Sequence, residues 1–344
     1  GNATETRRLQ GVAAGLVGPQ STDAINGSQL YAAMAEIEKI HYFSVKSNVT
    51  GNQDNTGASG VNAIAIGPNA STITEASITM GLNANASDRG KNAVAIGTDA
   101  KTTAENGVSL GHKANSEYSN STAIGYSSHA NGGNATAVGT NAKAVTNSTA
   151  LGSNTDAKDL GAVGNSTKAS GISSTATGFN AEASGNFSSA YGNDARAKGN
   201  RSVAVGYNAK AEESATAVGN NANASAQASI AIGKGAVGTA ADGVAIGSSA
   251  NATVQNSVAL GKDSVAGGNV FGETAHEAAF KNDNGVSENK QFKAGLANNS
   301  LGAVSVGKEG FERQIQNVGA GRVTANSTDA INGSQLYQVA KTLG

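Results

Sequence analysis

The feature that most constrains this chain is a short phrase, alanine then an aliphatic residue then glycine, that recurs along most of its length. Alanine stands two positions before the glycine in thirteen of sixteen copies, and the interval within the array is 14 residues in most cases, with values from 12 to 16. The glycines are at positions 67, 81, 97, 111, 125, 139, 152, 164, 178, 192, 206, 219, 233, 247, 261 and 307. A period of this kind predicts a stacked solenoid, in which each repeat packs only on its neighbours.

Each repeat contains enough residues for two short strands and two turns. The aliphatic and β-branched residues before the glycine favour a strand, and glycine permits the positive φ or the close backbone approach of a tight corner. A cluster of Asn, Ser and Gly lies half a repeat away, and further small residues such as Ala70 and Ala86 follow the glycine at fixed offsets. We therefore predict an all-β fold with one coil of a parallel β-roll per repeat.

Composition agrees with a thin roll and excludes several classes of protein. The chain has 46 Gly, no Cys, no Trp and 4% aromatic residues, so large side chains are too few for a conventional packed core. The formal net charge of −1 argues against nucleic acid as a partner. Without Cys there are no disulfides and no thiolate metal sites. No apolar run approaches the ~20 residues that span a membrane.

Alternation along the strand predicts an interface. In the segment 63–67, Ile64 and Ile66 face one side while Ala63 and Ala65 face the other. The alanine side suits the interior of a thin roll, so the aliphatic side is left as a long apolar stripe, which marks an interface. A cyclic assembly would close this stripe, and the periodicity leaves dimer and trimer open. The predicted interface residues of the roll are Ile66, Ile96, Ile124, Val138, Val205, Val218, Ile232 and Ile246.

The same module occurs at both ends of the chain. Ser21–Tyr31 is identical to Ser327–Tyr337, and each copy leads into a helical pattern for which we expect N-caps at Ser28 and Ser334. Helices this short are marginal alone, and their 4-3 spacing of apolar residues predicts a coiled coil. An ordinary amphipathic helix packed on its own domain is the alternative. The predicted seam residues are Leu30, Met34, Ile37 and Leu336.

These motifs resemble the trimeric autotransporter adhesins with YadA-like heads. The resemblance rests on the Ala-(Ile/Val)-Gly repeats and on the Asp-Ala-Ile-Asn-Gly-Ser-Gln-Leu module at 23–30 and 329–336, and it covers about 1–31, 60–265 and 301–344. It implies a left-handed parallel β-roll, a homotrimer, and a neck that leads from the head to a coiled-coil stalk. It also implies a passenger segment exported to the bacterial cell surface, whose signal peptide and outer-membrane anchor lie outside this segment.

The expected organisation follows from these motifs. The predicted segments are a partial N-terminal neck at 1–27, a coiled-coil helix at 28–42, a connector at 43–59, the β-roll head at 60–266, an insertion at 267–300, the last coil with the C-terminal neck at 301–333, and the start of a stalk at 334–344. The insertion has no repeat. We interpret it as a cap of the roll or a cover of the neck junction, with a ligand-binding excursion as the alternative.

Nothing in the sequence indicates catalysis. The glycines of 233–238 spell GxGxxG after a strand-like run, but another repeat follows where a dinucleotide fold needs a helix. The four His residues are isolated, and no Ser-His-Asp set is suggested by spacing. We predict no enzyme activity, no cofactor and no metal site.

Exposed aromatic residues are the candidates for ligand contact. Tyr126, Phe179 and Tyr207 each follow a repeat glycine, at a turn where other repeats carry Pro, Thr, Lys or Ser. Aromatic residues at exposed turns can anchor a partner; the alternative is that they pad the outside of the roll. Phe187 and Tyr191 lie close to Phe179 in the sequence, and we expect them to mark an irregular coil.

The predicted function is attachment. The leading hypothesis is the head of an adhesin that binds a host extracellular-matrix protein or a host-cell surface receptor, or that mediates autoagglutination and biofilm formation. Three chains with many coils would offer repeated weak sites. The alternative is a rigid spacer with no ligand of its own, because a neck before this head implies another head further out. In neither case is nucleic acid a partner.

Overall fold

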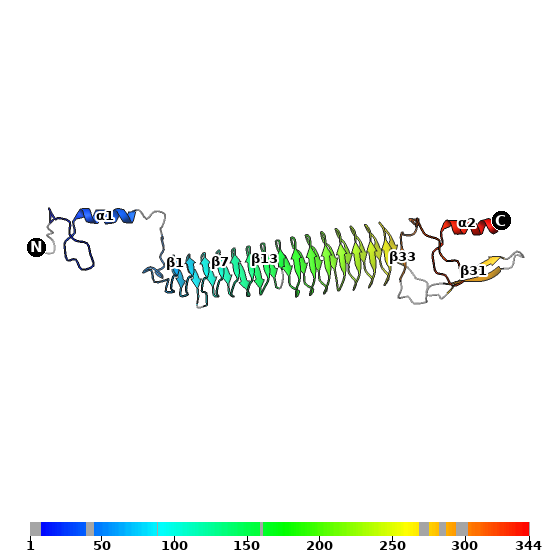
Figure 1. Ribbon diagram of the computed structural model, residues 1–344, viewed down its shortest axis with the longest axis horizontal. Helices are drawn as coiled ribbons and strands as arrows, with labels where there is room; N and C mark the ends of the chain where they lie inside the picture. The colour runs from blue at the N-terminus through cyan, green and yellow to red at the C-terminus, as the bar shows by residue number, and fades with distance from the viewer. Residues whose placement is uncertain are drawn as a thin grey trace. The chain divides into compact units, whose positions relative to one another are not determined.

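The computed structural model describes residues 8–38, 45–87, 89–158, 161–267, 302–343 and the backbone of 275–281 and 287–293. The predicted segments 1–27, 28–42, 43–59 and 267–300 each lie partly outside the described residues. The chain divides into two units, Gly1–Thr50 and Gly51–Gly344, which are described separately. The described residues between 51 and 267 form a stack of coils, and each coil contributes one strand to each of two parallel sheets (Figure 1).

The first sheet has 16 strands in sequence order. They are β1 (Ile64–Ile66), β3 (Ile78–Met80), β5 (Val94–Ile96), β7 (Val108–Leu110), β9 (Thr122–Ile124), β11 (Thr136–Val138), β13 (Thr149–Leu151), β15 (Gly161–Val163), β17 (Thr175–Thr177), β19 (Ser189–Tyr191), β21 (Val203–Val205), β23 (Thr216–Val218), β25 (Ile230–Ile232), β27 (Val244–Ile246), β29 (Val258–Leu260) and β33 (Val304–Ser305).

The second sheet has 15 strands. They are β2 (Ser71–Thr72), β4 (Asn85–Ala86), β6 (Lys101–Thr102), β8 (Asn115–Ser116), β10 (His129–Asn131), β12 (Lys143–Val145), β14 (Asp156–Ala157), β16 (Lys168–Ala169), β18 (Glu182–Ala183), β20 (Arg196–Ala197), β22 (Lys210–Ala211), β24 (Asn223–Ala224), β26 (Val237–Gly238), β28 (Asn251–Ala252) and β30 (Val265–Ala266).

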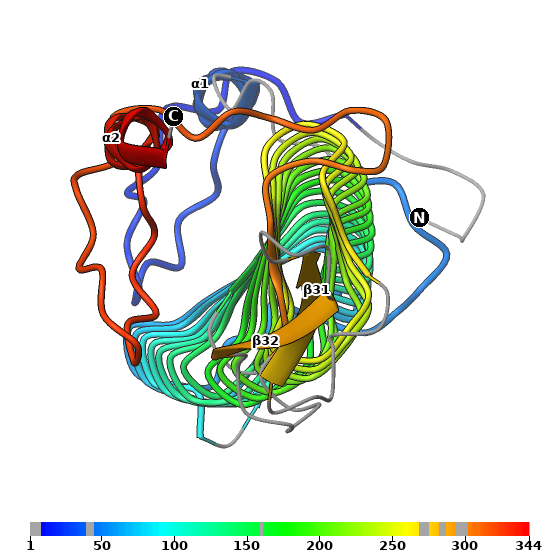
Figure 2. The same ribbon diagram turned by 90° about the vertical axis from the view of Figure 1, so that its right-hand side faces the viewer.

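Register follows the sequence repeat. Each residue pairs with its equivalent in the next coil, so that Ala204 is opposite Ala217 and Val205 is opposite Val218. Viewed along the stack, successive coils lie over one another with a gradual twist (Figure 2). The predicted parallel β-roll is confirmed.

The interior of the roll is filled by small side chains. Ala204, Ala209 and Ala211 point inward from the two strands and the turn of one coil, and each is at most 1% exposed. No fully buried side chain of the described residues is larger than threonine. Where serine replaces alanine, its hydroxyl can donate to a nearby carbonyl, as when Ser202 Oγ donates to the oxygen of Gly199 at 2.6 Å, whereas Ser174 Oγ and Ser188 Oγ at the equivalent position have no hydrogen-bond partner. Two sheets can approach this closely only because methyl-sized groups separate them.

Each coil turns at two corners of the same type. At the first, Ala209 N–H donates to the oxygen of Gly206, and Asn208 between them has a φ of 51°. A positive φ at the third residue alone defines a type II turn, in which glycine and asparagine are favoured. The asparagines also bond along the stack, as when Asn208 Nδ2 donates to Asn221 Oδ1 at 2.9 Å. Sequence analysis did not predict this ladder of asparagines.

The two neck modules share one set of hydrogen bonds. In the first neck, which leads into α1 (Gly27–Glu38), the side-chain amide of Gln29 accepts from the backbone N–H of Gly15 and donates to the oxygen of Gly15. Asn26 Nδ2 donates to the oxygen of Val12 at 3.1 Å. Before α2 (Gly333–Leu343), the equivalent residues at an offset of 306 repeat these contacts.

The expected caps at Ser28 and Ser334 are wrong. In the first neck, Asn26 Oδ1 accepts from the backbone N–H of Gln29 at 3.2 Å, so Asn26 is the residue that caps α1. Ser28 lies inside the helix and donates to Asn26 Oδ1 at 2.7 Å. In the second neck, Asn332 Oδ1 accepts from the backbone N–H of Gln335 at 3.3 Å in the same way.

After the array, the chain leaves the roll and rejoins it. β31 (Ala275–Lys281) and β32 (Ser287–Lys293) form an antiparallel hairpin (Figure 2). β33 then pairs with β29 and continues the first sheet. The guanidinium of Arg313 donates to Ser264 Oγ at 2.8 Å and to the carbonyls of Lys262 and Val306, which ties the segment after β33 to the last coil.

Candidate binding surfaces of the roll

The two outer faces of the roll differ in chemistry. We call the outward residues of the 16-stranded sheet the apolar face; they are the first and third residues of each strand, such as Val203 and Val205 in β21. We call the outward residues of the 15-stranded sheet the polar face; Lys168, Glu182 and Arg196 are examples. Because the alanines between them are buried, every bulky side chain of a strand lies on an outer face.

The predicted interface residues of the roll lie together on the apolar face. They form the column immediately before the repeat glycines, where Ile232 and Ile246 are each 37% exposed and Leu260 is 46% exposed. The structure adds a second column on the same face, at the first residue of each strand, which the sequence-based set of interface residues left out. Its aliphatic members include Ile78, Val94, Val108, Val203, Ile230, Val244 and Val258. The apolar face is therefore two aliphatic side chains wide from β1 to β7, at β21 and from β25 to β29, whereas the first residue is Thr, Gly or Ser from β9 to β19 and at β23.

The helical seams are also uncovered. Leu30, Met34 and Ile37 of α1 are 53%, 52% and 67% exposed, and Leu336 of α2 is 60% exposed. Apolar side chains that recur on one side of a short helix and find no cover are typical of a coiled-coil seam.

The candidate aromatic residues lie in one column but not in one cluster. Tyr126, Phe179 and Tyr207 are each the second residue of a type II turn, and they are 49%, 54% and 51% exposed. Phe179 and Tyr207 are two coils apart, or about 10 Å at the usual strand spacing, whereas Tyr126 lies four coils before Phe179. Tyr126 instead contacts the ring of His112 edge-on at 5.3 Å.

The expected irregular coil at Phe187 and Tyr191 is wrong. β19 pairs in register with both neighbours, and Tyr191 takes the position of an aliphatic residue on the apolar face. Phe187 lies at the second corner of its coil with a φ of 60°, and it is the only aromatic residue with a positive φ in the described part of the chain.

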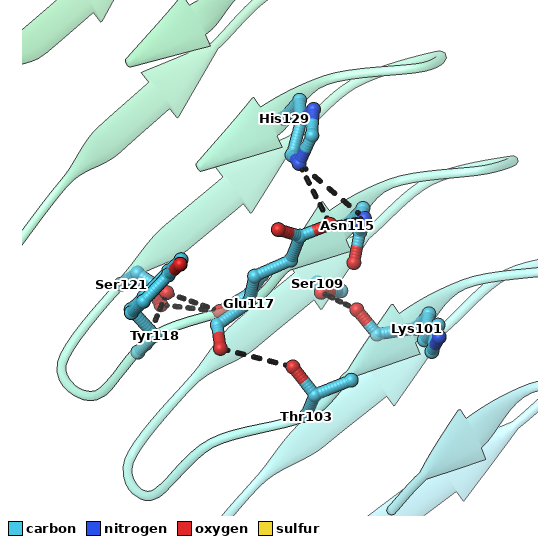
Figure 3. A network of polar contacts seen from close by, with 9 residues as sticks. Lys101, Thr103, Ser109, Asn115, Glu117, Tyr118, Ser121 and His129 are labelled. Carbon is cyan, nitrogen blue, oxygen red and sulfur yellow. Dashed lines mark hydrogen bonds and ion pairs between the residues drawn. The ribbon is translucent and has the colours of Figure 1, made fainter. Parts of the chain in front are cut away.

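A polar hollow that sequence analysis missed lies at the second corner of the early coils. It has a volume of about 420 Å³, and its walls include Arg89, Lys101, Thr103, Glu117 and Tyr118. The signal that could have revealed it is the interval of 16 residues between Gly81 and Gly97, the longest in the array. Figure 3 shows the network beside it, in which the Glu117 carboxylate meets Asn115 and His129.

Acid–base chemistry is sparse across the described residues. No group of three or more His, Asp or Glu side chains there is arranged to hold a metal ion. The Arg322 guanidinium beside Asp329 holds the pKa of that carboxyl below its ordinary value, and the pKa of Arg322 is raised in turn by the same contact. This pair lies in the C-terminal neck and not on the roll.

None of the described helices has both the length and the apolar character required to cross a membrane.

Solved structures related to this chain include two heads. The C-terminal YadA-like domain of BPSL2063 from Burkholderia pseudomallei is 32% identical, covering 38% of this chain and 50% of that one with a TM-score of 0.24. The collagen-binding domain of the Yersinia adhesin YadA is 21% identical, covering 83% of this chain and 86% of that one with a TM-score of 0.19.

Family models and a curated relative match the same modules. Autotransporter adhesin BtaE of Brucella suis biovar 1 (strain 1330) is 46% identical over 59 residues, which are 17% of this chain and 8% of that protein. The coiled stalk of trimeric autotransporter adhesin matches residues 8–65 and 314–344. The YadA head domain repeat matches 58–84, 89–114, 119–142, 162–236 in overlapping copies, and 239–264. Because head repeats cover more than half of its length, the chain belongs to the YadA-like trimeric autotransporter adhesins.

Proposed function

We propose that this chain is the surface-exposed head segment of a bacterial adhesin, which acts as a homotrimer and attaches the cell to a host extracellular-matrix protein or a host-cell receptor. The observation that carries the proposal is the uncovered apolar face, whose column before the repeat glycines is mostly aliphatic, on a chain of the YadA-like family. The role is binding and not catalysis.

Trimerisation follows from the need to cover the apolar face. A contiguous apolar surface of this length on a soluble chain marks a site of association. A closed ring of identical chains covers the same face on each copy without leaving an open end. The seams of α1 and α2 also favour self-association, because short helices with an apolar stripe gain their stability from partners.

Assembly through the apolar face leaves the polar face and the corners for recognition. Each trimer would present three copies of every exposed corner, and weak sites linked on one rigid body bind with increased overall affinity. Tyr126, Phe179 and Tyr207 are the proposed contact residues, since half-exposed aromatic side chains on a rigid turn bury area at small entropic cost.

The test is a pull-down of the chain against fibronectin, collagen and epithelial receptor ectodomains. We expect binding at micromolar trimer, and a reduction when Tyr126, Phe179 and Tyr207 are all changed to Ser. The matched control is Asn193→Ser, which alters the same corner column between Phe179 and Tyr207. Retention of full binding by the triple variant would contradict the aromatic assignment.

A spacer is the second candidate, and the neck at the N-terminal end favours it. The hydrogen bonds of Gln29 with Gly15 show the same neck geometry before the roll as after it. A roll that lies between two necks suits a rigid spacer that projects a more distal binding head. Absence of binding to every tested ligand at micromolar trimer would favour the spacer.

A further inference from the structure

One coil of the roll is longer than the stack requires. Between Gly81 and Gly97 the interval is 16 residues, against 14 in most of the array. The additional residues fall at the second corner, since Ser87 still pairs with Thr102 and Asn92 N–H still donates to the oxygen of Glu75. β5 then continues in register. Insertions in solenoids leave the stack as loops on one face, which is often the binding face.

The insertion gives a wall to the polar hollow. Arg89 comes from the insertion, Lys101 and Thr103 from the next coil, and Tyr118 and Ser119 from the coil after that. The volume of about 420 Å³ is within the range of pockets that hold small molecules. Three successive coils therefore contribute polar groups to one concave surface.

Two cations, Arg89 and Lys101, and one carboxylate, that of Glu117, line the hollow. Arg89 and Lys101 are exposed, and within the part of the chain that the structure describes neither forms an ion pair. The Glu117 carboxylate, in contrast, accepts from Asn115 Nδ2 at 2.8 Å and lies 3.0 Å from His129 Nε2. Figure 3 shows this carboxylate directed toward His129 and away from the side chain of Lys101. The site consequently favours an anion at Arg89 and Lys101.

Neutral groups beside the two cations suit a sugar. Tyr118 is 51% exposed, and an aromatic ring offers an apolar face with a polar tip. The Thr103 hydroxyl donates to the oxygen of Glu117 at 2.9 Å, which leaves its oxygen free to accept. Saccharides combine apolar ring faces with hydroxyl donors, and an acidic saccharide adds the anion. Guanidinium groups bind carboxylate or sulfate oxygens in pairs.

We infer that the hollow at Arg89, Lys101 and Tyr118 binds an anionic saccharide, one that carries a carboxylate or a sulfate. The inference rests on the proposed adhesin role and names a ligand class for it. It is a site separate from the aromatic corner residues, which lie at the opposite corner of their coils. Arg89 and Lys101 would bind the oxygens of a carboxylate and of a sulfate in the same way, and the experiment below distinguishes saccharides that carry one from those that carry the other.

The test is isothermal titration of the 344-residue chain with four probes: 3′-sialyllactose, an unsulfated uronic-acid tetrasaccharide, a sulfated tetrasaccharide of the same backbone, and neutral lactose. We expect at least one acidic probe to bind and lactose to show no binding at the same concentration. Preference among the acidic probes identifies carboxylate or sulfate. The double variant Arg89→Gln with Lys101→Gln should lose at least tenfold in affinity.

The matched control is Lys91→Gln with Lys143→Gln, which removes the same charge from residues that do not line the hollow. It should change affinity less than twofold. Equal losses in both double variants would overturn the site, since they would show attraction to net charge alone. So would an absence of binding to all acidic probes, or equally tight binding of an Asp/Glu-rich peptide.

The same samples separate this inference from the proposed function. Circular dichroism and sedimentation establish that each variant is folded and assembled. A chain that trimerises and binds matrix protein but no acidic saccharide contradicts the saccharide site alone. A chain that binds acidic saccharide with loss in the first double variant supports the site, whatever the result with matrix proteins.

Discussion

Glycine at the corner after each aliphatic residue is required by two constraints at once. Gly206 has a φ of 129°, a conformation that residues with a side chain rarely adopt, and a Cβ there would lie 2.6 Å from the oxygen of Gly219 in the next coil. The same contact recurs through most of the column. The neighbouring backbone cannot retreat without breaking the ladder, so both constraints persist in every coil.

Gly206→Ala is therefore expected to destabilise the roll by at least about 2 kcal/mol, given that a backbone conformation of this kind alone costs about 1–3 kcal/mol. Gly235→Ala is the control. Gly235 has a φ of 64° with its nearest atom 3.8 Å from the added Cβ, and alanine already occupies this conformation at Ala76 and Ala228. The measurement is the urea midpoint of each variant, and equal shifts would contradict the argument.

At Phe187, in contrast to the glycines, the residue type does not suit the backbone conformation. Its φ of 60° lies in the left-handed region, and its side chain is 59% exposed, so no buried contact offsets the strain. Asparagine tolerates this conformation, and Phe187→Asn is expected to stabilise the protein by about 1 kcal/mol. Phe179→Asn, at an exposed position without positive φ, should give no such gain. An unchanged or lower thermal midpoint for Phe187→Asn would contradict this.

The sequence predicted the position of a residue correctly where only one physical explanation fits its pattern. The alanine two positions before each glycine alternates along the strand with aliphatic residues, and this alternation predicts that the alanine side chain lies inside the roll. The hydrogen bonds between corner asparagines of successive coils were not predicted, because they depend on how the coils stack and not on the residues of one coil. Only the coordinates show Asn208 with positive φ and bonded to the next coil.

At the scale of elements, the two necks provide an internal comparison. Asp23 accepts from the backbone N–H of Leu16, whereas Asp329 accepts from both the backbone and the guanidinium of Arg322, at 3.2 and 2.9 Å. The Arg322 guanidinium lowers the pKa of Asp329 below 3.8. A carboxyl with a depressed folded pKa stabilises the fold above its unfolded pKa, and that contribution is lost as pH falls through the folded value.

Arg322→Leu, which copies the residue of the first neck, should raise the pKa of Asp329 toward its ordinary value. The rise should be partial, because the backbone donor remains. The measurement is an NMR titration of the Asp329 carboxyl below pH 5, and the control is Lys341→Leu in α2, which should leave the titration unchanged. An Asp329 pKa equal to that of the unsubstituted chain would contradict the assigned cause.

The limits of sequence reasoning are clear for particular elements. The necks were found because their sequence repeats. Ser28 was predicted as the cap in place of Asn26, because both residue types cap helices and only the geometry of the hydrogen bond distinguishes them. The hairpin of β31 and β32 has no repeat to indicate it. The polar hollow depends on side chains from three coils that only register brings together, although the interval of 16 residues marks its place.

For the whole molecule, we expect the difference between the two outer faces to determine assembly. Val205 and Lys210 belong to the same coil, but Val205 lies on the apolar face and Lys210 on the polar face. Val205→Asp would place a charge against sister chains and is expected to weaken association at least tenfold, because a buried unpaired charge is strongly disfavoured. Lys210→Asp should leave association unchanged. Equal effects of the two changes would contradict the assignment of the faces.

The central claim is that the apolar face is closed by two further copies of the chain. Sedimentation equilibrium of the 344-residue chain, from 1 to 50 micromolar, tests this directly. The account predicts a species with three times the mass of the 33.8 kDa chain at the upper end of that range. A chain that remains a folded monomer throughout the range would contradict it.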